Sequence, residues 1–240
     1  MKVLVLGATG ATGKLVVQQL IKRNIEVRIV VRDPQKVSGD LININLLEFI
    51  VGSISVFNRS QYYDLVKDCD AVISCLGHNI TFRGLFGKPR LLVTYCMMNV
   101  CEAIQESKKD KTKVILMNTT ANGNKNVNEK YTLKDRIVLS LLSVILPPQR
   151  DNVKAAEYLV NSFLESKSCI EWTAVRPDTL INEEKVTEYE IMESPKRSPV
   201  FDAGKSSRIN VAHFMIELLL NKELWNKWKF KMPVIYNSGK

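Results

Sequence analysis

Three glycines spaced three residues apart stand near the start of the chain, at Gly7, Gly10 and Gly13. The apolar, β-branched run before them predicts a buried strand at residues 3–6, and the amphipathic run after them predicts a helix at 14–22. In such a unit, Gly7 permits a tight turn, Gly10 lets the backbone approach a pyrophosphate, and Gly13 lets the helix pack closely on the strand. Because a helix N-terminus attracts phosphate, the pattern predicts dinucleotide binding.

A basic residue stands at the end of the second expected strand, where dinucleotide-binding folds of this kind bind the adenine ribose of the cofactor. Proteins selective for NAD usually place Asp or Glu about 20 residues after the glycine turn, where it binds the 2′-hydroxyl. This chain has Arg32 there, followed by Asp33 and then by Lys36. A guanidinium can pair with a 2′-phosphate and stack on adenine, and Lys36 adds a second positive charge. The pattern favours NADP as the cofactor, while Asp33 keeps NAD possible.

Length and composition are typical of one globular domain over residues 1–240, and they argue against several other classes. No apolar run reaches the roughly 18 residues that a membrane span needs. The five cysteines are odd in number and form no C-x-x-C pair, which is typical of reduced thiols, so we expect a cytoplasmic protein. Two histidines, His78 and His213, cannot supply a metal site of the usual spacing. The net charge of +9 is spread along the chain without aromatic interleaving, so we expect attraction of a phosphate-rich cofactor rather than a nucleic-acid partner.

Apolar runs of strand type alternate with helical patterns through the first three quarters of the chain. Further strands are expected at 26–32, 47–53, 70–77, 113–120 and 170–177, and helices at 59–67 and 91–107. An irregular stretch is expected around 79–89. This spacing predicts parallel strands joined by right-handed crossovers, which is the doubly wound α/β sheet of a Rossmann fold.

An insertion at 122–148 interrupts this alternation. It begins with a loop rich in Asn and Gly and continues with a strongly apolar helix at 133–146, ended by Pro147 and Pro148. We expect ordinary core packing for this helix, with covering the active site or joining a subunit interface as the alternative. A helix at 151–165, capped by Asp151, follows. Residues 178–240 are expected to form a small lobe on the substrate side, with strands at 188–193 and 232–236, a polar loop at 194–207 and a helix at 211–220.

The heptapeptide Gly-Ala-Thr-Gly-Ala-Thr-Gly at residues 7–13 resembles the Gly-x-x-Gly-x-x-Gly turn of atypical short-chain dehydrogenase/reductases. The segments Val-Arg-Asp-Pro-Gln-Lys at 31–36, Ser-Cys-Leu-Gly at 74–77 and Val-Arg-Pro at 175–177 resemble further blocks of that family. Within it, the chain is similar to the branch of biliverdin reductase B, also called NADPH-flavin reductase. The segment at 207–215 resembles the closing helix of that branch, so the similarity covers nearly the whole chain.

The resemblance implies a set of cofactor contacts at the carboxyl ends of the strands. On the phosphate and adenine side they are Gly7, Thr9, Gly10, Ala11, Thr12 and Gly13 for the diphosphate, Arg32 and Lys36 for the 2′-phosphate, Ser53 and Ile54 for the adenine, and Cys75, Leu76 and Gly77 for the ribose and diphosphate. On the nicotinamide side they are Asn118, Thr119, Thr120, Pro177, Thr179 and Leu180. Ser53 stands where the family usually has aspartate, which is a departure at the adenine contact.

Many short-chain reductases use a Tyr-x-x-x-Lys pair after the fifth strand, in which the lysine lowers the pKa of the tyrosine that donates the proton. Tyr63 and Lys67 have this spacing, but they lie between the third and fourth strands, so we interpret them as a coincidence on a surface helix. Lys154 occupies the approximate position of the lysine, with an arginine four residues before it. Tyr131, in the insertion, is a further candidate proton donor.

Two functions remain open from the sequence. The first is an NAD(P)H-dependent oxidoreductase that reduces a flat conjugated acceptor such as a flavin or quinone, with Thr120 and Lys154 as its catalytic residues, because the cofactor itself carries the hydride. The second is a non-catalytic NADP-binding redox sensor of the NmrA-like type; a sugar isomerase or dehydratase ranks last. Cys75 is either packing under the nucleotide or a redox-sensing thiol. We expect a small-molecule acceptor between the nicotinamide and the helix at 137–146, in a monomer or homodimer.

Overall fold

The computed structural model describes residues 1–37, 44–78, 87, 89–107, 111–124, 127, 129, 131–163 and 168–238. Within these residues the central sheet has eight strands in the order β3-β2-β1-β4-β5-β6-β10-β8. All neighbouring strands pair in parallel except β8, which is antiparallel to β10 at one edge. The strands are β1 (Lys2–Leu6), β2 (Glu26–Val31), β3 (Leu47–Val51), β4 (Ala71–Ser74), β5 (Thr112–Met117), β6 (Ile170–Pro177), β8 (Tyr189–Met192) and β10 (Val234–Asn237).

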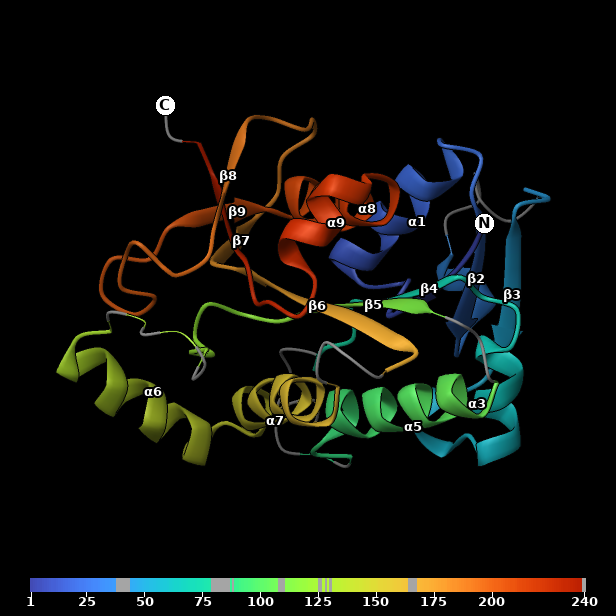
Figure 1. Ribbon diagram of the computed structural model, residues 1–240, viewed down its shortest axis with the longest axis horizontal. Coiled ribbons are helices and arrows are strands. Elements are labelled where there is room, and N and C mark those ends of the chain that lie inside the picture. The colour runs from blue at the N-terminus through green and yellow to red at the C-terminus, as the bar shows by residue number, and fades with distance from the viewer. Residues whose placement is uncertain are drawn as a thin grey trace.

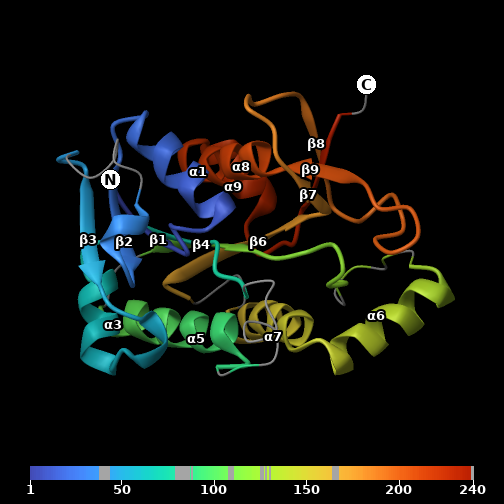
Figure 2. The same cartoon turned by 180° about the vertical axis from the view of Figure 1, so that it is seen from behind.

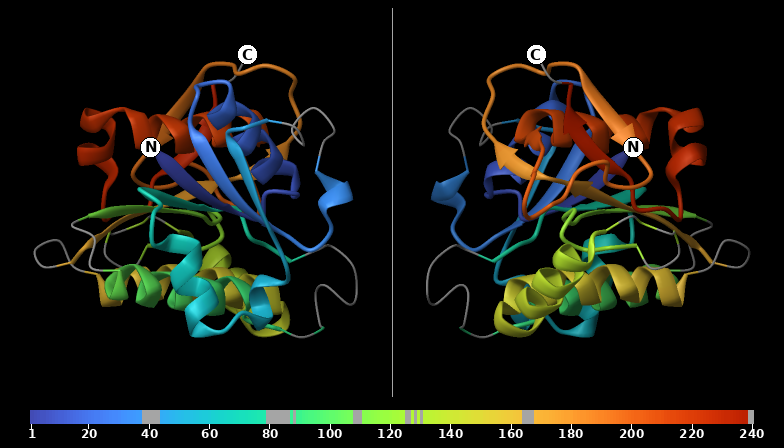
Figure 3. Two further views of the ribbon diagram at one scale, coloured as in Figure 1. Left: turned by 90° about the vertical axis from the view of Figure 1, so that its right-hand side faces the viewer. Right: turned by 90° about the vertical axis from the view of Figure 1, so that its left-hand side faces the viewer.

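Helices cover both faces of this sheet, as Figures 1 and 2 show from opposite sides. On one face lie α1 (Ala11–Ile21), α8 (Arg208–Leu220) and α9 (Lys222–Trp228). On the other lie α3 (Arg59–Val66), α5 (Leu92–Glu106) and α7 (Pro147–Ser162). The end views in Figure 3 show the three layers. The predicted doubly wound α/β sheet is therefore confirmed.

The unbroken apolar run of β1 is explained by the two helical layers. Successive side chains of a strand point to opposite faces of its sheet. Val3 and Val5 accordingly join the core beneath α1 and α8, whereas Leu4 and Leu6 join the core beneath α3, α5 and α7. Both faces of β1 are buried, so it has no polar alternation.

Several predicted bounds differ from the structure. The helix expected at 151–165 begins four residues earlier, with Pro147 at its first position, so Asp151 does not cap it. The helix expected at 211–220 begins at Arg208, capped by Ser207, whose side chain accepts from the backbone of Asn210. The polar loop at 194–207 ends in a strand, β9 (Lys205–Ser207), which pairs with β7 (Thr179–Ile181) in a second sheet. The irregular stretch expected at 79–89 lies mostly outside the described residues.

The elements that sequence patterns missed are short. The strands β7 and β9 have three residues each, and α9 has seven, which is too few for a hydrophobic period to be recognised. Two short 3-10 turns also lie after strands: η1 (Pro34–Lys36) and η2 (Ile54–Val56). In the part of the chain that the structure describes, no helix is long and apolar enough to cross a membrane.

Candidate dinucleotide and acceptor site

The glycine turn joins β1 to α1 with almost no space for side chains. Gly7 has a φ of +75°, and a Cβ added there would lie 2.6 Å from the carbonyl oxygen of Cys75. A Cβ added at Gly13 would lie 2.1 Å from the carbonyl oxygen of Gly7. Any side chain at either position would force α1 or the end of β4 away from β1. These two glycines therefore hold the turn together.

Gly10 has a different environment, because it faces open space. It is the N-cap of α1, and no side chain caps this helix. The first backbone hydrogen bond of the helix joins the Lys14 N–H to the Gly10 carbonyl at 2.9 Å, so within the described residues the N–H groups of positions 11–13 have no partner. A Cβ at Gly10 would meet only the Gly7 carbonyl oxygen, at 3.1 Å. Free N–H groups beside an open glycine fit a pyrophosphate.

Arg32 directly follows β2 with an exposed side chain, and it forms no hydrogen bond or ion pair with any described residue. The neighbouring carboxylate of Asp33 accepts from the Gln35 backbone N–H at 3.0 Å and caps η1. The Asp33 carboxylate, which could bind the 2′-hydroxyl of NAD, is thus hydrogen-bonded within its own turn. The Arg32 guanidinium, in contrast, has no partner among the described residues. The side chain of Lys36 lies outside the described residues.

The residues expected around the adenine and its ribose follow β3 and β4. Ser53 precedes η2, and its hydroxyl lies 3.1 Å from that of Ser55. Ile54 is buried, and its carbonyl accepts from the Tyr62 hydroxyl at 2.8 Å. Burial raises the pKa of the Cys75 thiol to about 12, which is typical of a packed thiol and not of a redox-reactive one.

Leu76 and Gly77 follow Cys75 at the end of β4. Leu76 is half-buried and Gly77 is exposed. A Cβ at Gly77 would have no neighbour within 4 Å, so the chain is open here. Both residues lie after the carboxyl end of β4, as the cofactor assignment requires.

The end of β5 is a hydrogen-bonded loop. The Asn118 amide donates to the Asn152 carbonyl of α7 at 2.8 Å, and its oxygen accepts from the Thr119 N–H at 2.9 Å. Thr120 is buried; its N–H donates to the Pro177 carbonyl at 3.1 Å, and its carbonyl accepts from the Tyr131 hydroxyl at 2.9 Å. The structure therefore brings Asn118, Thr120, Pro177 and Tyr131 together at one edge of the sheet.

Next to this loop, Asp178 fixes the end of β6. Its carboxylate accepts from the Thr179 N–H at 2.8 Å and from the Gly204 N–H at 3.0 Å. Burial raises its pKa above the ordinary value, against the opposing effect of these hydrogen bonds and of Thr120. Thr179 is exposed and Leu180 is half-buried, so both can border a ligand at this edge.

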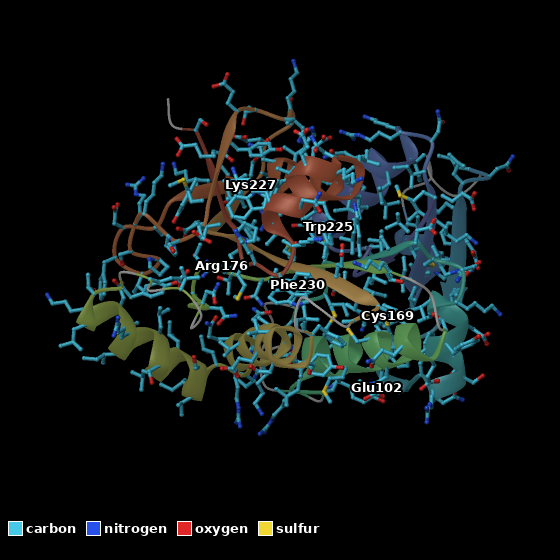
Figure 4. The ribbon with its side chains drawn as sticks, in the orientation of Figure 1. Glu102, Cys169, Arg176, Trp225, Lys227 and Phe230 are labelled. Carbon is cyan, nitrogen blue, oxygen red and sulfur yellow. The ribbon has the colours of Figure 1, made fainter. Side chains whose placement is uncertain are left out.

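Arg176, at the end of β6, attaches the inserted segment to the sheet. It is fully buried, and its Nη2 lies 2.6 Å from Oε1 of the buried Glu129. Its Nη1 donates to the Asn122 carbonyl at 3.0 Å, and its Nε to the Met232 carbonyl at 2.7 Å. Figure 4 shows Arg176 and Cys169 at opposite ends of β6, with Arg176 on the side toward α6 (Leu133–Ile145).

A buried carboxylate that the sequence analysis read as a helix cap has another role. Asp151 lies inside α7 and accepts from four donors: the Val93 N–H (2.8 Å), the Thr94 N–H (2.9 Å), the Thr94 hydroxyl (2.6 Å) and His78 Nε2 (2.8 Å). It thus caps α5, whose own N-cap residue offers no side-chain hydrogen bond. Burial alone would raise the pKa of Asp151, but the hydrogen bonds from His78, Thr94 and Val93 hold it below its ordinary value.

Lys154 and the pair of Tyr63 and Lys67, considered as catalytic candidates, lie at two different helices, α7 and α3. Lys154 lies one turn after Asp151 on α7, half-buried, and forms no hydrogen bond or ion pair with a described residue. Tyr63 and Lys67 lie at the surface on and just after α3, where Lys67 pairs with Asp64 at 2.9 Å. The expected place of this pair on a surface helix is confirmed, and its lack of a catalytic role stays a prediction. The catalytic roles of Thr120 and Lys154 stay predictions.

The expectation of ordinary core packing for the apolar helix is wrong, and the position of the acceptor beneath it stays a prediction. Along α6, Ile137, Leu141 and Val144 are all exposed to solvent. Only Asp135 and Leu139 are buried on the helix. Figures 1 and 2 show α6 projecting from the body beyond α7. The physical reason is that Asp135 turns inward to bind Thr132 and Ser198, which leaves the apolar face on the opposite side.

A doubly wound sheet with an open glycine turn and free N–H groups defines a dinucleotide-binding α/β protein. The family described as NAD(P)H-binding matches residues 7–222, so the chain belongs to that family. Its cofactor is NAD(P)H, as the sequence predicted, and the resemblance to atypical short-chain dehydrogenase/reductases is confirmed. In the described residues, no cluster of three His, Cys, Asp or Glu side chains could hold a metal ion.

Individual relatives are distant in sequence. An uncharacterised protein of Arabidopsis thaliana, described as chloroplastic, is 28% identical over 225 residues, covering 92% of this chain and 73% of that protein. A short-chain dehydrogenase/reductase of Veillonella parvula in complex with NADP has a TM-score of 0.70 at 15% identity, covering 99% of this chain and 95% of its own. The anaerobillin reductase ChuY of Escherichia coli O157:H7 also has a TM-score of 0.70, at 13% identity, covering 100% and 98%. The two structures establish the fold, and the cellular location of this chain stays a prediction.

Proposed function

We propose that the protein is an NADPH-dependent reductase of a flat conjugated acceptor such as a flavin or a quinone. The bound cofactor would supply the hydride. The chain itself then has to hold the diphosphate at the N-terminus of α1, select the 2′-phosphate with Arg32, and keep the acceptor at the carboxyl edge of the sheet. The name of one structural neighbour, an anaerobillin reductase, is consistent with a reductase of this kind.

The observation that carries the proposal is the set of side chains that α7 presents beside the end of β5. The hydrogen bond from Asn118 to the Asn152 carbonyl holds this turn of α7 against β5. The turn carries Arg150, Asp151 and Lys154, with no tyrosine, and Asp151 is committed to α5 and His78. An alcohol dehydrogenase needs a placed proton donor, whereas a reduced flavin or quinone can take its proton from water. The turn therefore favours a conjugated acceptor.

We assign two catalytic roles within this proposal. Thr120, whose hydroxyl hydrogen-bonds to Asp178, would border the reacting ring. Lys154 would hold the ribose next to that ring with its ammonium group. Thr179 and Leu180 would cover the opposite side. These roles need only positioning, which a fixed hydrogen-bonded edge can provide.

The test is to follow NADPH oxidation by absorbance with a panel of flavins, quinones and linear tetrapyrroles. We expect turnover with at least one class. Replacing Lys154 with Met should lower kcat/KM by about tenfold, the value of one hydrogen bond to a charged group, while Lys222→Met, at an exposed lysine of α9, should leave it unchanged. An unchanged kcat/KM for Lys154→Met would remove the assigned role.

One observation also favours a second candidate, a non-catalytic NADP-binding redox sensor. A sensor of this kind needs no proton donor, and the part of α7 beside the end of β5, residues 150–154, has no tyrosine. The buried Cys75 thiol argues against thiol chemistry as the signal, so the sensor would read the oxidation state of the nucleotide. Tight NADPH binding without turnover of any acceptor, together with different affinities for NADPH and NADP⁺ by calorimetry, would support this candidate and overturn the reductase.

A further inference from the structure

The helix α6 exposes an apolar face that nothing in the described chain covers. Five of its apolar residues are between 53% and 79% exposed: Leu133, Ile137, Leu141, Val144 and Ile145. The first four follow the spacing i, i+4, i+8 and i+11, which places them on one side of the helix. The helix is about 20 Å long and projects from the body in both views (Figures 1 and 2). A continuous apolar strip on a protruding helix indicates a binding surface.

The exposed charges of the described residues at 129–154, the segment that contains α6, all have one sign. Residues 129–154 contain three acidic residues, Glu129, Asp135 and Asp151, and each is buried and hydrogen-bonded inside the protein. The basic residues Lys134, Arg136 and Arg150 are exposed, and none pairs with a described carboxylate. Every exposed charge of the described residues in this segment is therefore positive. The whole chain adds to this field with a net charge of +9.

A second exposed hydrophobe comes from a distant part of the chain. Asp135, in the first turn of α6, accepts a hydrogen bond from the Ser198 hydroxyl. The Ser198 oxygen in turn accepts from the Phe201 N–H at 2.8 Å, which places the loop at 198–201 beside the N-terminal end of α6. Phe201 is 62% exposed. The loop is attached to the Asp135 side of α6, opposite the apolar strip, so Phe201 is an exposed neighbour of the strip and not part of it.

We propose that the apolar face of α6 docks the protein on the surface of a bilayer that contains anionic phospholipids. The apolar side chains would enter the boundary between headgroups and acyl chains, and the three cations would face the lipid phosphates. This inference goes beyond the reductase function and holds whether or not the protein is a reductase.

A second copy of the chain is the other candidate occupant of this face, and two observations disfavour it. A strip about 20 Å long and 10 Å wide covers roughly 200 Å², whereas a stable interface needs about 800 Å² from each partner. Two α6 helices packed together would also bring Lys134 and Arg136 of both copies close to one another with no exposed carboxylate on the helix to compensate them. A bilayer with anionic phospholipids offers an apolar layer for the strip and phosphate groups for the cations, so it fits both features of this face.

The test is flotation of the full-length protein with vesicles of phosphatidylcholine alone and of phosphatidylcholine mixed with phosphatidylglycerol. We expect binding to the anionic vesicles only, weakened by salt. Val144→Glu and Ile137→Glu should each lower the vesicle partition coefficient at least about tenfold, because each removes a large apolar side chain from the interface. Each of Lys134→Glu and Arg136→Glu should lower it about fivefold or more.

The matched control is Val56→Glu, since Val56 is 76% exposed but lies on η2, remote from α6 in the chain. It should bind vesicles like the unchanged protein, and circular dichroism should show all variants folded. Failure of the unchanged protein to float with anionic vesicles would overturn the proposal. So would equal losses in Val56→Glu and Val144→Glu. A dimer that Ile137→Glu converts to a monomer, without vesicle binding, would assign the face to a second copy instead.

Discussion

Replacing Asp151 with Asn should destabilise the protein while keeping the shape of the side chain. The carboxylate accepts from His78, from the Val93 N–H, and twice from Thr94, at distances of 2.6–2.9 Å, and it is fully buried. The amide oxygen of an Asn can still accept from Thr94. Its NH₂ group, however, would face the Val93 N–H, which is also a donor.

The magnitude follows from the bonds that change. A buried donor left without an acceptor costs about 1–3 kcal/mol, and the loss of charge weakens the remaining hydrogen bonds. We therefore expect the free energy of unfolding to fall by about 2–4 kcal/mol in Asp151→Asn, measured by urea denaturation followed by circular dichroism. The control is Asn152→Ala on the next residue, where only the backbone carbonyl is used and which should change stability by less than about 0.5 kcal/mol.

The pH dependence gives a second check on the same variant. Because the folded protein holds the pKa of Asp151 below its ordinary value of 3.8, the ionised carboxylate contributes stability above that value and loses the contribution as pH falls through the folded pKa. The difference between the unchanged protein and Asp151→Asn should shrink as the pH falls below 3.8 through the folded pKa of Asp151. Equal stability of the two proteins at neutral pH, or a difference that grows as the pH falls below 3.8, would refute the reasoning.

Three further predictions concern the nucleotide site. Gly13→Ala should lower the free energy of unfolding by about 2–3 kcal/mol, since its Cβ would lie 2.1 Å from a carbonyl oxygen. The Gly10→Ala variant, in contrast, should stay folded but bind NADPH more weakly in a titration. Arg32→Asp should reverse the preference for NADPH over NADH, a preference that we estimate at about 1.5–3 kcal/mol; equal affinities of the unchanged protein for both cofactors would contradict this. Under native conditions iodoacetamide should alkylate the partly exposed Cys169 and leave Cys75 unmodified, as measured by mass spectrometry. The reason is that Cys75 is buried, which also raises the pKa of its thiol.

The parts of the site that could be predicted from the sequence are those whose physics is local. The glycine turn is one example, because the strand before it and the helix after it lie within the same 20 residues and each glycine has its own steric reason. Arg32 and the cap by Asp33 are also local, since a strand end and a following Pro are visible in six residues. The Rossmann sheet follows in the same way, because each strand–helix unit has its own hydrophobic period.

The network of Asp151 could not be predicted, because its partners are far apart in the chain. Asp151 lies 57 residues after Thr94 and 73 after His78. In sequence, an aspartate three residues after Pro148 and before an amphipathic run is typical of a helix cap. The structure shows that Pro147 already occupies the first helical position, so the carboxylate falls one turn inside α7 and is free to cap α5. The sequence signal that could have suggested this is the missing cap of α5 itself, where Leu91 stands at the N-cap.

The orientation of α6 shows why an apolar pattern alone cannot identify what a helix binds. The period of Leu133, Ile137 and Leu141 predicts a helix with one apolar side. Such a side can pack into a core, cover a site as a lid, bind a partner protein or enter a lipid surface, and the period does not distinguish these roles. The orientation of α6 is set by its opposite face, where Asp135 accepts hydrogen bonds from Thr132 and from Ser198, a loop residue 63 positions away in the chain. A buried, hydrogen-bonded carboxylate fixes the inward side of the helix, since turning it outward would break both contacts. The apolar side is therefore directed away from the sheet, and the unpaired cations beside it are the property that distinguishes a lipid surface from the other occupants.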